Sequence, residues 1–179
     1  MAKRVFESDL SVEGIKNLKM QLQSYKEDVL NKKCKELVSN LIDKGYEVAK
    51  SSISQSPVGR QVYLNIESRE WRTGVEMLLV ATGSIHEVPG REPFNVMLAV
   101  EFGSGIYYNQ SVNPNADKYG YGPGTYPGQV HAFEDGWYYW DERSGKWRFT
   151  HGIKATMPMY NASVKIREEF ESEIRRVFS

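Results

Sequence analysis

The feature that most constrains this chain is a long amphipathic stretch near its N-terminus. Apolar residues first recur there at alternating steps of three and four, at Ile15, Leu18, Leu22, Tyr25 and Val29. The pattern resumes further along, at Leu30, Cys34, Leu37, Val38, Leu41, Val48, Ala49 and Ile53. Such spacing places apolar side chains on one stripe of a helix and the many lysines and glutamates on its wet side. A helix of this length is costly unless a partner covers its stripe, which is a first indication of self-assembly.

The ends of this helix have recognisable signals. Ser11 is a suitable N-cap, and Glu13 lies in the first turn, facing the positive end of the helix dipole. The helix is expected to stop near Ser56, because Pro57 disfavours helical geometry in the residue before it. Gly45 is a candidate for a kink or a break.

The next segment predicts a sheet. Residues 61–67 alternate apolar and polar side chains, which is the period of a strand, and residues 74–81 form a second candidate strand. A third candidate, residues 94–102, ends at the glycines of the Phe102-Gly103-Ser104-Gly105 run. Three strands joined by short turns predict an antiparallel meander packed on the helix, and therefore an α+β fold.

The last part of the chain changes character. Residues 103–128 are rich in Gly, Pro, Asn and Tyr, and a loop of this length is usually functional or ordered by a partner. In residues 136–149, aromatic side chains flank a polar turn that contains glycine, which predicts a β-hairpin. After Pro158, a final helix is expected to run to the C-terminus.

Composition excludes several classes of function. The 23 basic and 23 acidic side chains balance to a net charge of zero, so no overall field attracts nucleic acid, and no sequence-specific nucleic-acid partner is expected. No stretch approaches the roughly 20 apolar residues that cross a bilayer, so no membrane partner is expected either. The start of the chain turns acidic before a signal peptide could form, which predicts synthesis in a cytoplasm. Cys34, the single cysteine, is interpreted as a small core residue.

Signatures of enzyme chemistry are missing from the sequence. His86, His131 and His151 are far apart and form no metal-binding spacing, and no G-x-S-x-G elbow is present. The glycines of residues 120–128 lack the lysine and following helix of a phosphate loop. Three carboxylates on the last helix are interpreted as a solvated face: Glu169, Glu171 and Glu173. We therefore expect no catalysis, no cofactor and no metal.

The aromatic hairpin is the one segment that could bind a small ligand. Its tryptophans and tyrosines could stack on a sugar ring or enclose a quaternary amine. The string Gly-Trp-Tyr-Tyr followed by Ser-Gly-Lys-Trp also resembles one unit of the choline-binding wall-anchoring repeats, although those proteins form sites between repeats and this chain has one copy. A carbohydrate- or choline-binding module is the alternative to a structural protein. A DNA-processing enzyme is a further alternative, because a long helix plus a sheet is a common frame.

Several motifs, taken in order, resemble the tail-completion (tail-component, head–tail joining) family of siphophages and prophages. A long helix ends in a small-Pro-Val turn at residues 56–58, and an aliphatic-Glu-Phe-Gly motif follows at residues 100–103. An arm at residues 124–132 precedes the Gly-Trp-Tyr-Tyr hairpin, and Gly152 with residues 158–162 (Pro-Met-Tyr-Asn-Ala) matches the last motif. The chain departs where family members follow Pro-Val with Asp-Thr-Gly, since Gly59-Arg60-Gln61-Val62 stands there instead.

The resemblance implies a curved antiparallel sheet with the two long helices packed on it, in one domain over residues 1–179 that carries residues 103–150 as an inserted arm and hairpin. It also implies a ring of subunits, often six, in the neck or tail of a virion made in a bacterial host cytoplasm. The partners would be the head connector and the tail-tube or tail-terminator proteins.

From these motifs we expect a subunit interface. In this hypothesis Phe102 anchors a strand end, Glu101 reaches a basic group on a neighbour, and the arm lies on an adjacent subunit because it is poor at burying itself. The expected interface residues are Glu101, Phe102, Gly103, Tyr107, Tyr108, Tyr119, Tyr121, Tyr126, Pro127, Trp137 and Trp140.

Overall fold

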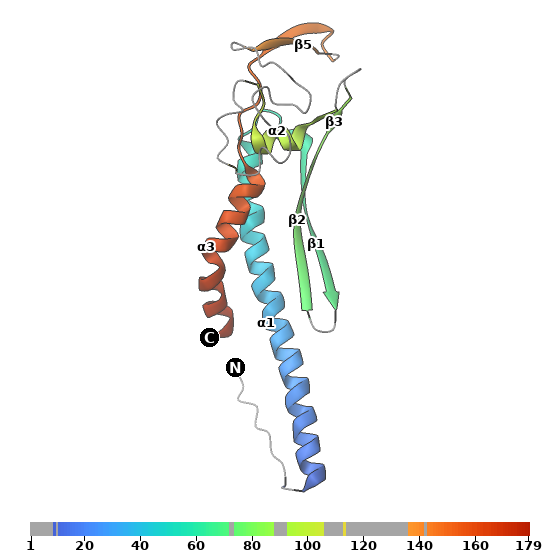
Figure 1. The fold of residues 1–179 in the computed structure, drawn as a ribbon, viewed down its shortest axis with the longest axis vertical. Helices are drawn as coiled ribbons and strands as arrows, with labels where there is room; N and C mark the ends of the chain where they lie inside the picture. Colours follow the sequence, from blue (N-terminus) through green and yellow to red (C-terminus); the bar gives the residue numbers. More distant parts are fainter. Residues whose placement is uncertain are drawn as a thin grey trace.

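A computed structural model describes most of the chain and confirms the α+β class. The described residues are 9, 11–71, 74–87, 93–105, 113, 136–141 and 143–179, with only the backbone described at positions 137, 139 and 140. Two long helices, one short helix, one 3-10 turn and three two-stranded antiparallel pairs make up the regular structure of these residues. The arrangement is elongated, with α1 running along its length (Figure 1).

The long N-terminal helix forms as expected and spans Val12–Ser54 as α1. The Ser11 hydroxyl accepts a hydrogen bond from the Gly14 N–H at 2.9 Å, which confirms the predicted N-cap. The helix ends just before Pro57, also as predicted. The expectation of a kink or break at Gly45 is wrong, because α1 is continuous there. Gly45 is buried against Ile166 of α3, and an added Cβ would lie 2.7 Å from the Ile166 Cδ1 atom, so this glycine allows close helix packing.

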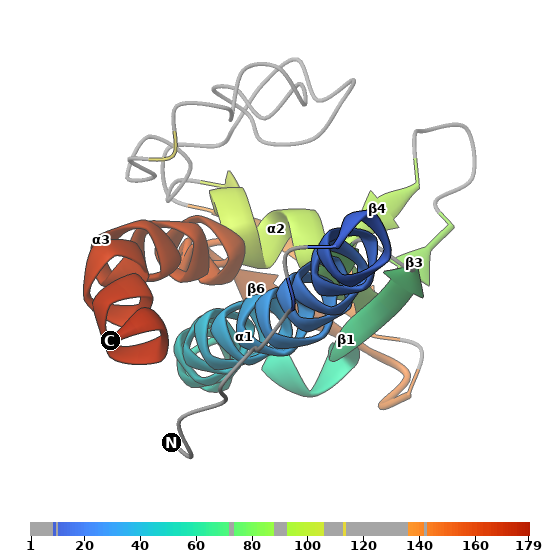
Figure 2. The same cartoon turned by 90° about the horizontal axis from the view of Figure 1, so that it is seen from below.

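The core lies along the C-terminal half of α1. The last helix, α3 (Pro158–Phe178), packs on one side of it, and the two-stranded ribbon of β1 (Val62–Trp71) and β2 (Gly74–Gly83) lies on another (Figures 1 and 2). The buried apolar residues of the described chain come from both long helices and from the short helix α2: Leu41, Ile42, Ala49, Ile53, Val96, Met97, Ala99, Val100, Phe102, Ala162 and Val177.

The ribbon confirms two of the three predicted strands. Val62 pairs with Gly83 at one end and Trp71 with Gly74 at the other, so the register is unbroken over ten residue pairs. In the first half of β1, the half-buried residues Val62, Leu64 and Ile66 alternate with exposed residues, and from Glu67 to Trp71 every residue is exposed. Near its turn the ribbon is tied to α1 by the Lys35–Glu70 ion pair at 2.6 Å. A short 3-10 helix over Gly59–Gln61 joins α1 to the ribbon where the sequence departs from the family pattern.

The third predicted strand is wrong. After a two-residue strand, β4 (Phe94–Asn95), which pairs with β3 (Ile85–His86), the chain forms the helix α2 over Val96–Phe102. The Asn95 side chain caps this helix by accepting from the Met97 and Leu98 N–H groups. A continuous apolar run fits a buried helix as well as a buried strand, and here almost every residue of the run is buried. The predicted three-stranded meander is therefore a two-stranded ribbon followed by a helix.

The predicted aromatic hairpin is present. Strands β5 (Trp137–Asp141) and β6 (Lys146–Thr150) pair antiparallel, with Trp140 opposite Trp147. Asp141 ends β5 and accepts hydrogen bonds from the Arg143 N–H and the Ser144 hydroxyl, while Gly145 takes a positive φ of 59° in the turn. The hairpin lies beyond α2, at the end of the molecule opposite to the start of α1 (Figure 1).

Candidate functional site

Two of the motif segments, residues 100–103 and residues 158–162, meet at one place, which we call the helix junction. It comprises the last turn of α1, the C-terminal end of α2 with residues 103–105, the segment 152–157, and the first turn of α3. Segments more than 40 residues apart in the sequence are joined here by hydrogen bonds, as between Ser104 and Ile153. The junction is the best-defined candidate site among the described residues.

Glu101 is the centre of the helix junction. Its side chain is almost fully buried, with 5% exposure for the residue. One carboxylate oxygen accepts from the Met159 N–H at 2.9 Å, and the other accepts from the Tyr160 N–H at 3.0 Å and from the Asn113 side-chain amide at 2.8 Å. The carboxylate thus occupies the N-terminal end of α3 from a different helix.

The N-terminus of α3 needs this carboxylate because it has no cap of its own. Pro158 stands in the first turn, and the residue before it, Met157, has a left-handed backbone (φ 49°) and a side chain that caps nothing. The free N–H groups and the helix dipole at this end both favour a negative charge. Glu101, which is distant in sequence, therefore caps the N-terminus of α3 as a local Ser or Asp does in most helices.

The electrostatics of Glu101 reflect two opposing effects. Burial raises the pKa of its carboxyl above the ordinary value, while the hydrogen bonds from Met159, Tyr160 and Asn113 lower it; burial is the larger effect. A carboxylate held against this desolvation cost by three donors is sensitive to the loss of any one of them. Both carboxylate oxygens accept hydrogen bonds from within the chain, so the role of Glu101 is structural.

Glycines let the backbones of the junction approach closely. Ser104 and Ile153 exchange backbone hydrogen bonds at 2.7 and 3.1 Å, and the Ser104 hydroxyl also accepts from the Ile153 N–H at 2.9 Å. Gly103 and Gly152, which flank this contact, have positive φ values of 85° and 105°. A Cβ on Gly152 would overlap the carbonyl oxygen of Ser104. The two ends of the predicted insertion are therefore held together at Ser104 and Ile153.

Further hydrogen bonds tie the returning segment to α1 and α2. The Val100 carbonyl accepts from the Thr156 N–H at 2.9 Å. The Asn161 side chain donates to the Thr156 carbonyl at 3.0 Å and to the Ser52 hydroxyl of α1 at 3.4 Å. Asn161 thus links the start of α3 to the end of α1.

Only some of the expected interface residues lie in the described part of the chain. Glu101, Phe102 and Gly103 lie together in the helix junction, and Phe102 is buried. Glu101 differs from the expectation that it reaches a neighbour, because its carboxylate is turned inward. Trp137 and Trp140 lie on β5, where only their backbone is described. The remaining expected residues lie outside the described part of the chain: Tyr107, Tyr108, Tyr119, Tyr121, Tyr126 and Pro127.

The described aromatic side chains of the hairpin are exposed. Tyr138 and Trp147 are 67% and 66% exposed, and Phe149 is 46% exposed. Tyr138 and Phe149 make an edge-to-face contact across the strands, with ring centroids 5.1 Å apart, and Phe149 contacts His151 in the same way at 4.9 Å. Tyr138 and Phe149 thus form an exposed aromatic pair on the hairpin.

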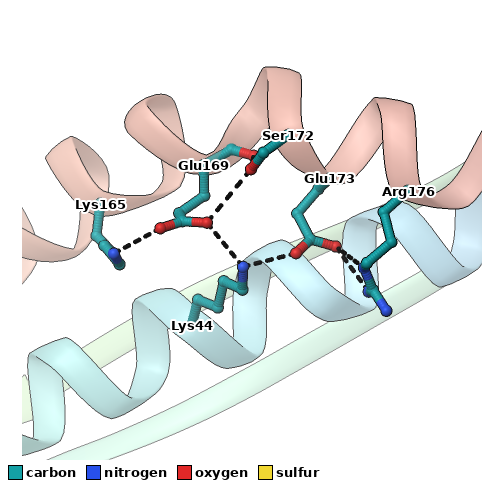
Figure 3. A network of polar contacts seen from close by, with 6 residues as sticks. All are labelled: Lys44, Lys165, Glu169, Ser172, Glu173 and Arg176. Carbon is teal, nitrogen blue, oxygen red and sulfur yellow. Dashed lines mark hydrogen bonds and ion pairs between the residues drawn. The ribbon is translucent and has the colours of Figure 1, made fainter.

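An ion-pair network joins α1 to α3 below the junction (Figure 3). Lys44 of α1 lies between Glu169 and Glu173, at 2.9 and 2.6 Å, and Lys165 and Arg176 pair with the outer oxygens of these two glutamates. The expectation that the carboxylates of α3 form a solvated face is thus correct for Glu171 and wrong for Glu169 and Glu173, whose side chains are 27% and 6% exposed.

The network shifts the pKa values of its members. Hydrogen bonds from Lys165 and Lys44 lower the pKa of Glu169 to about 2, and those from Lys44 and Arg176 lower the pKa of Glu173. The same contacts, first with Glu169, raise the pKa of Lys44. Folding therefore favours the charged form of every one of these three groups.

Replacing Lys44 by methionine is expected to make stability less dependent on acid pH. Because the pKa of Glu169 is lowered from 4.5 to about 2, its contribution is complete above pH 4.5 and is lost as the pH falls toward 2. Without Lys44, the pKa of Glu169 should rise toward its ordinary value. The measurement is urea unfolding from pH 7 to pH 2, together with an NMR titration of the Glu169 carboxyl. Lys16→Met, on the same helix and outside the network, is the matched control; an equal change in both variants would contradict the account.

The described residues contain no group of three or more His, Cys, Asp or Glu side chains placed to hold a metal ion. Of the histidines within the described ranges, His86 contacts the Gln61 side chain at 2.9 Å and His151 contacts Phe149. Cys34 is half-buried on α1. No helix in the described part of the chain is both long and apolar enough to span a bilayer.

Sequence reasoning missed the cap that Glu101 provides. A usable signal was present, because Pro158 marks a helix start while Met157 before it is not a capping residue. That combination indicates a cap supplied from elsewhere in the chain. It does not identify Glu101, since the spatial partner depends on the turn that α2 makes.

Comparison with known proteins identifies no relative of this chain. Family models, curated proteins and solved structures give no significant match to the chain.

Proposed function

We propose that this chain is a non-enzymatic structural subunit of a tailed phage or prophage, a head–tail joining or tail-completion protein that assembles as an oligomeric ring. Its partners in this proposal are further copies of itself, the head connector, and the tail-tube or tail-terminator proteins. The place of action would be the neck or tail of the virion.

The observation that carries the proposal is the contact between two of the resemblance motifs at the helix junction. Glu101 of the aliphatic-Glu-Phe-Gly motif accepts hydrogen bonds from Met159 and Tyr160 of the Pro-Met-Tyr-Asn-Ala motif. The small-Pro-Val turn follows α1 at the same junction, where Asn161 contacts Ser52. Short motifs that are scattered in sequence but build one structural centre are more specific together than each is alone.

The clamped insertion also supports a ring subunit. Ser104 and Ile153, at the two ends of the predicted insertion, pair with each other, so the segment between them starts and ends at a fixed base in the domain. A ring needs a surface that gives and a different surface that receives. In this proposal, the insertion of one subunit packs against a different surface on the domain of the next subunit. Tyr and Trp suit such a contact because they combine large area with a polar tip.

The experiment that tests the proposal is affinity purification of the tagged chain from cells that produce the phage. Connector or tail-terminator proteins among the bound proteins support a neck subunit. Binding to cell-wall glycan in their place contradicts it.

A second candidate function is favoured by the exposed hairpin rings. Tyr138 and Trp147 are exposed enough to stack on a sugar or to contact a quaternary amine. Titration of the protein with choline or wall glycan, followed by tryptophan fluorescence, tests this reading. A saturable signal that is lost in Trp147→Ala would favour a carbohydrate- or choline-binding module over the ring.

A further inference from the structure

Asn113 belongs to the predicted insertion, yet its side chain lies within the helix junction. The residue is 8% exposed, and its Nδ2 atom donates to the Glu101 carboxylate at 2.8 Å. Because Glu101 is buried as well, the contact joins two buried side chains that are 12 residues apart in the sequence. The insertion is therefore attached to the domain at Asn113, in addition to the pairing of Ser104 with Ile153.

The carboxylate oxygen that binds Asn113 also caps α3. The Oε1 atom of Glu101 accepts from Asn113 Nδ2 and from the Tyr160 N–H, the latter at 3.0 Å. The Oε2 atom accepts from the Met159 N–H at 2.9 Å. A donor from the insertion and a donor from the first turn of α3 thus share one acceptor atom, although they are far apart in the sequence.

The Glu101 carboxylate depends on each of these donors because it is buried. Removing a charged carboxylate from water is costly, and hydrogen bonds to its oxygens offset that cost. The bond from Asn113 is one of three that lower the pKa of Glu101 against the larger, opposing effect of burial. Loss of Asn113 therefore disfavours the charged form of Glu101, which is the form that the N-terminus of α3 favours.

The start of α3 is sensitive to such a change. Met157, which precedes the helix, has a left-handed backbone with φ 49° and provides no side-chain cap. A non-glycine residue keeps this conformation only where the surrounding contacts hold it. The first turn of α3 thus depends on Glu101, and Glu101 depends on Asn113.

We infer that Asn113 couples the insertion to α3, so that the attachment of the insertion at Asn113 and the order of the first turn of α3 depend on each other through Glu101. Such coupling is reciprocal, so a change that stabilises the cap also strengthens the attachment of Asn113. The inference deepens the proposed function, because a neighbouring subunit that binds the insertion would then act on α3. It rests on that function for the neighbour, but not for the coupling within one chain.

Hydrogen exchange measured by NMR in full-length Asn113→Ala protein tests the coupling. The Met159 and Tyr160 amides should exchange at least about tenfold faster than in the unaltered protein, and the Ile42 amide of α1 less than about threefold faster. Asn65→Ala, at an exposed asparagine of β1, is the matched control and should leave these rates unchanged. Asn113→Ser retains a shorter donor, so it should give an intermediate increase, and it replaces the alanine variant if that variant does not fold.

A double variant tests whether Glu101 is the link. In a Glu101→Ala background, verified as folded by circular dichroism, Asn113→Ala should change the exchange of the Tyr160 amide by less than about twofold. An undiminished effect in that background would exclude Glu101 as the link. If the Glu101→Ala protein does not fold, the same comparison is made in Glu101→Asp protein, whose shorter side chain cannot reach all three donors.

Two results with the single variant would overturn the inference. Unchanged exchange at Met159 and Tyr160 would show that α3 does not respond to Asn113. Equal acceleration at Ile42 would show that Asn113 supports the fold as a whole and has no particular effect on α3. All of these measurements use the isolated chain, so their failure leaves the proposed neck function standing, and an affinity purification without neck proteins leaves the coupling standing.

Discussion

Replacing Glu101 by glutamine is expected to lower the free energy of unfolding by about 3 kcal/mol and the melting temperature by roughly 6–12 °C. The amide keeps one acceptor oxygen, but its NH2 group must face either the Met159 N–H or the donors from Tyr160 and Asn113. At least one buried donor then loses its acceptor, and the N-terminus of α3 loses its charge. Urea unfolding monitored by circular dichroism measures the change.

The matched control for this variant is Glu171→Gln on α3. Glu171 is exposed and makes only a 3.5 Å pair with Arg175, so the same chemical change should cost less than about 0.5 kcal/mol. A Glu101→Gln protein as stable as the control would mean that the junction does not depend on the carboxylate. The contact between the two resemblance motifs would then have no energetic importance.

Alanine at Gly152 is expected to destabilise the protein by about 4 kcal/mol or to prevent folding. Gly152 has a φ of 105°, a conformation that side chains rarely adopt, and its Cβ would overlap the Ser104 carbonyl oxygen. Relief of that overlap would separate Ser104 from Ile153 and open the base of the insertion. Thermal and urea unfolding measure the loss.

Gly145→Ala separates the two causes of that effect. Gly145 also has a positive φ, 59°, but a Cβ there would meet nothing within 4 Å. It should therefore cost only the backbone strain, about 1 kcal/mol. Similar losses for both glycines would indicate that the close approach at Ser104 is unimportant, and that conformational strain alone sets the cost.

The elements with strong periodic or capping signals were predictable from the sequence. The start of α1 at Ser11, its end before Pro57, and the start of α3 near Pro158 all follow from local capping and proline chemistry. The first half of β1 was predictable because one of its faces is half-buried and the other is exposed, which produces alternation. Local rules work where local chemistry decides the conformation.

The remaining features depend on tertiary context. Residues 96–102 are buried on nearly all sides, so their pattern carries no period, and the Asn95 cap decides for a helix. Gly45 reads as a helix breaker, yet contact with Ile166 makes it a packing position. Glu173 reads as a surface charge until Lys44 and Arg176 are placed beside it. Those partners are more than 100 residues away or on the same turn, and no local rule selects between the two cases.

Affinity purification with mass spectrometry tests whether this chain joins the neck or tail of a phage particle. The tagged full-length chain and a variant lacking residues 107–127 would be recovered from phage-producing cells. The deletion removes Asn113 and its bond to Glu101, so the variant should be somewhat less stable but folded by circular dichroism. We expect connector or tail-terminator proteins with the full-length chain and their loss with the deletion variant. Recovery of no neck protein, with retention on choline or wall glycan, would contradict the account and assign the aromatic hairpin to ligand binding.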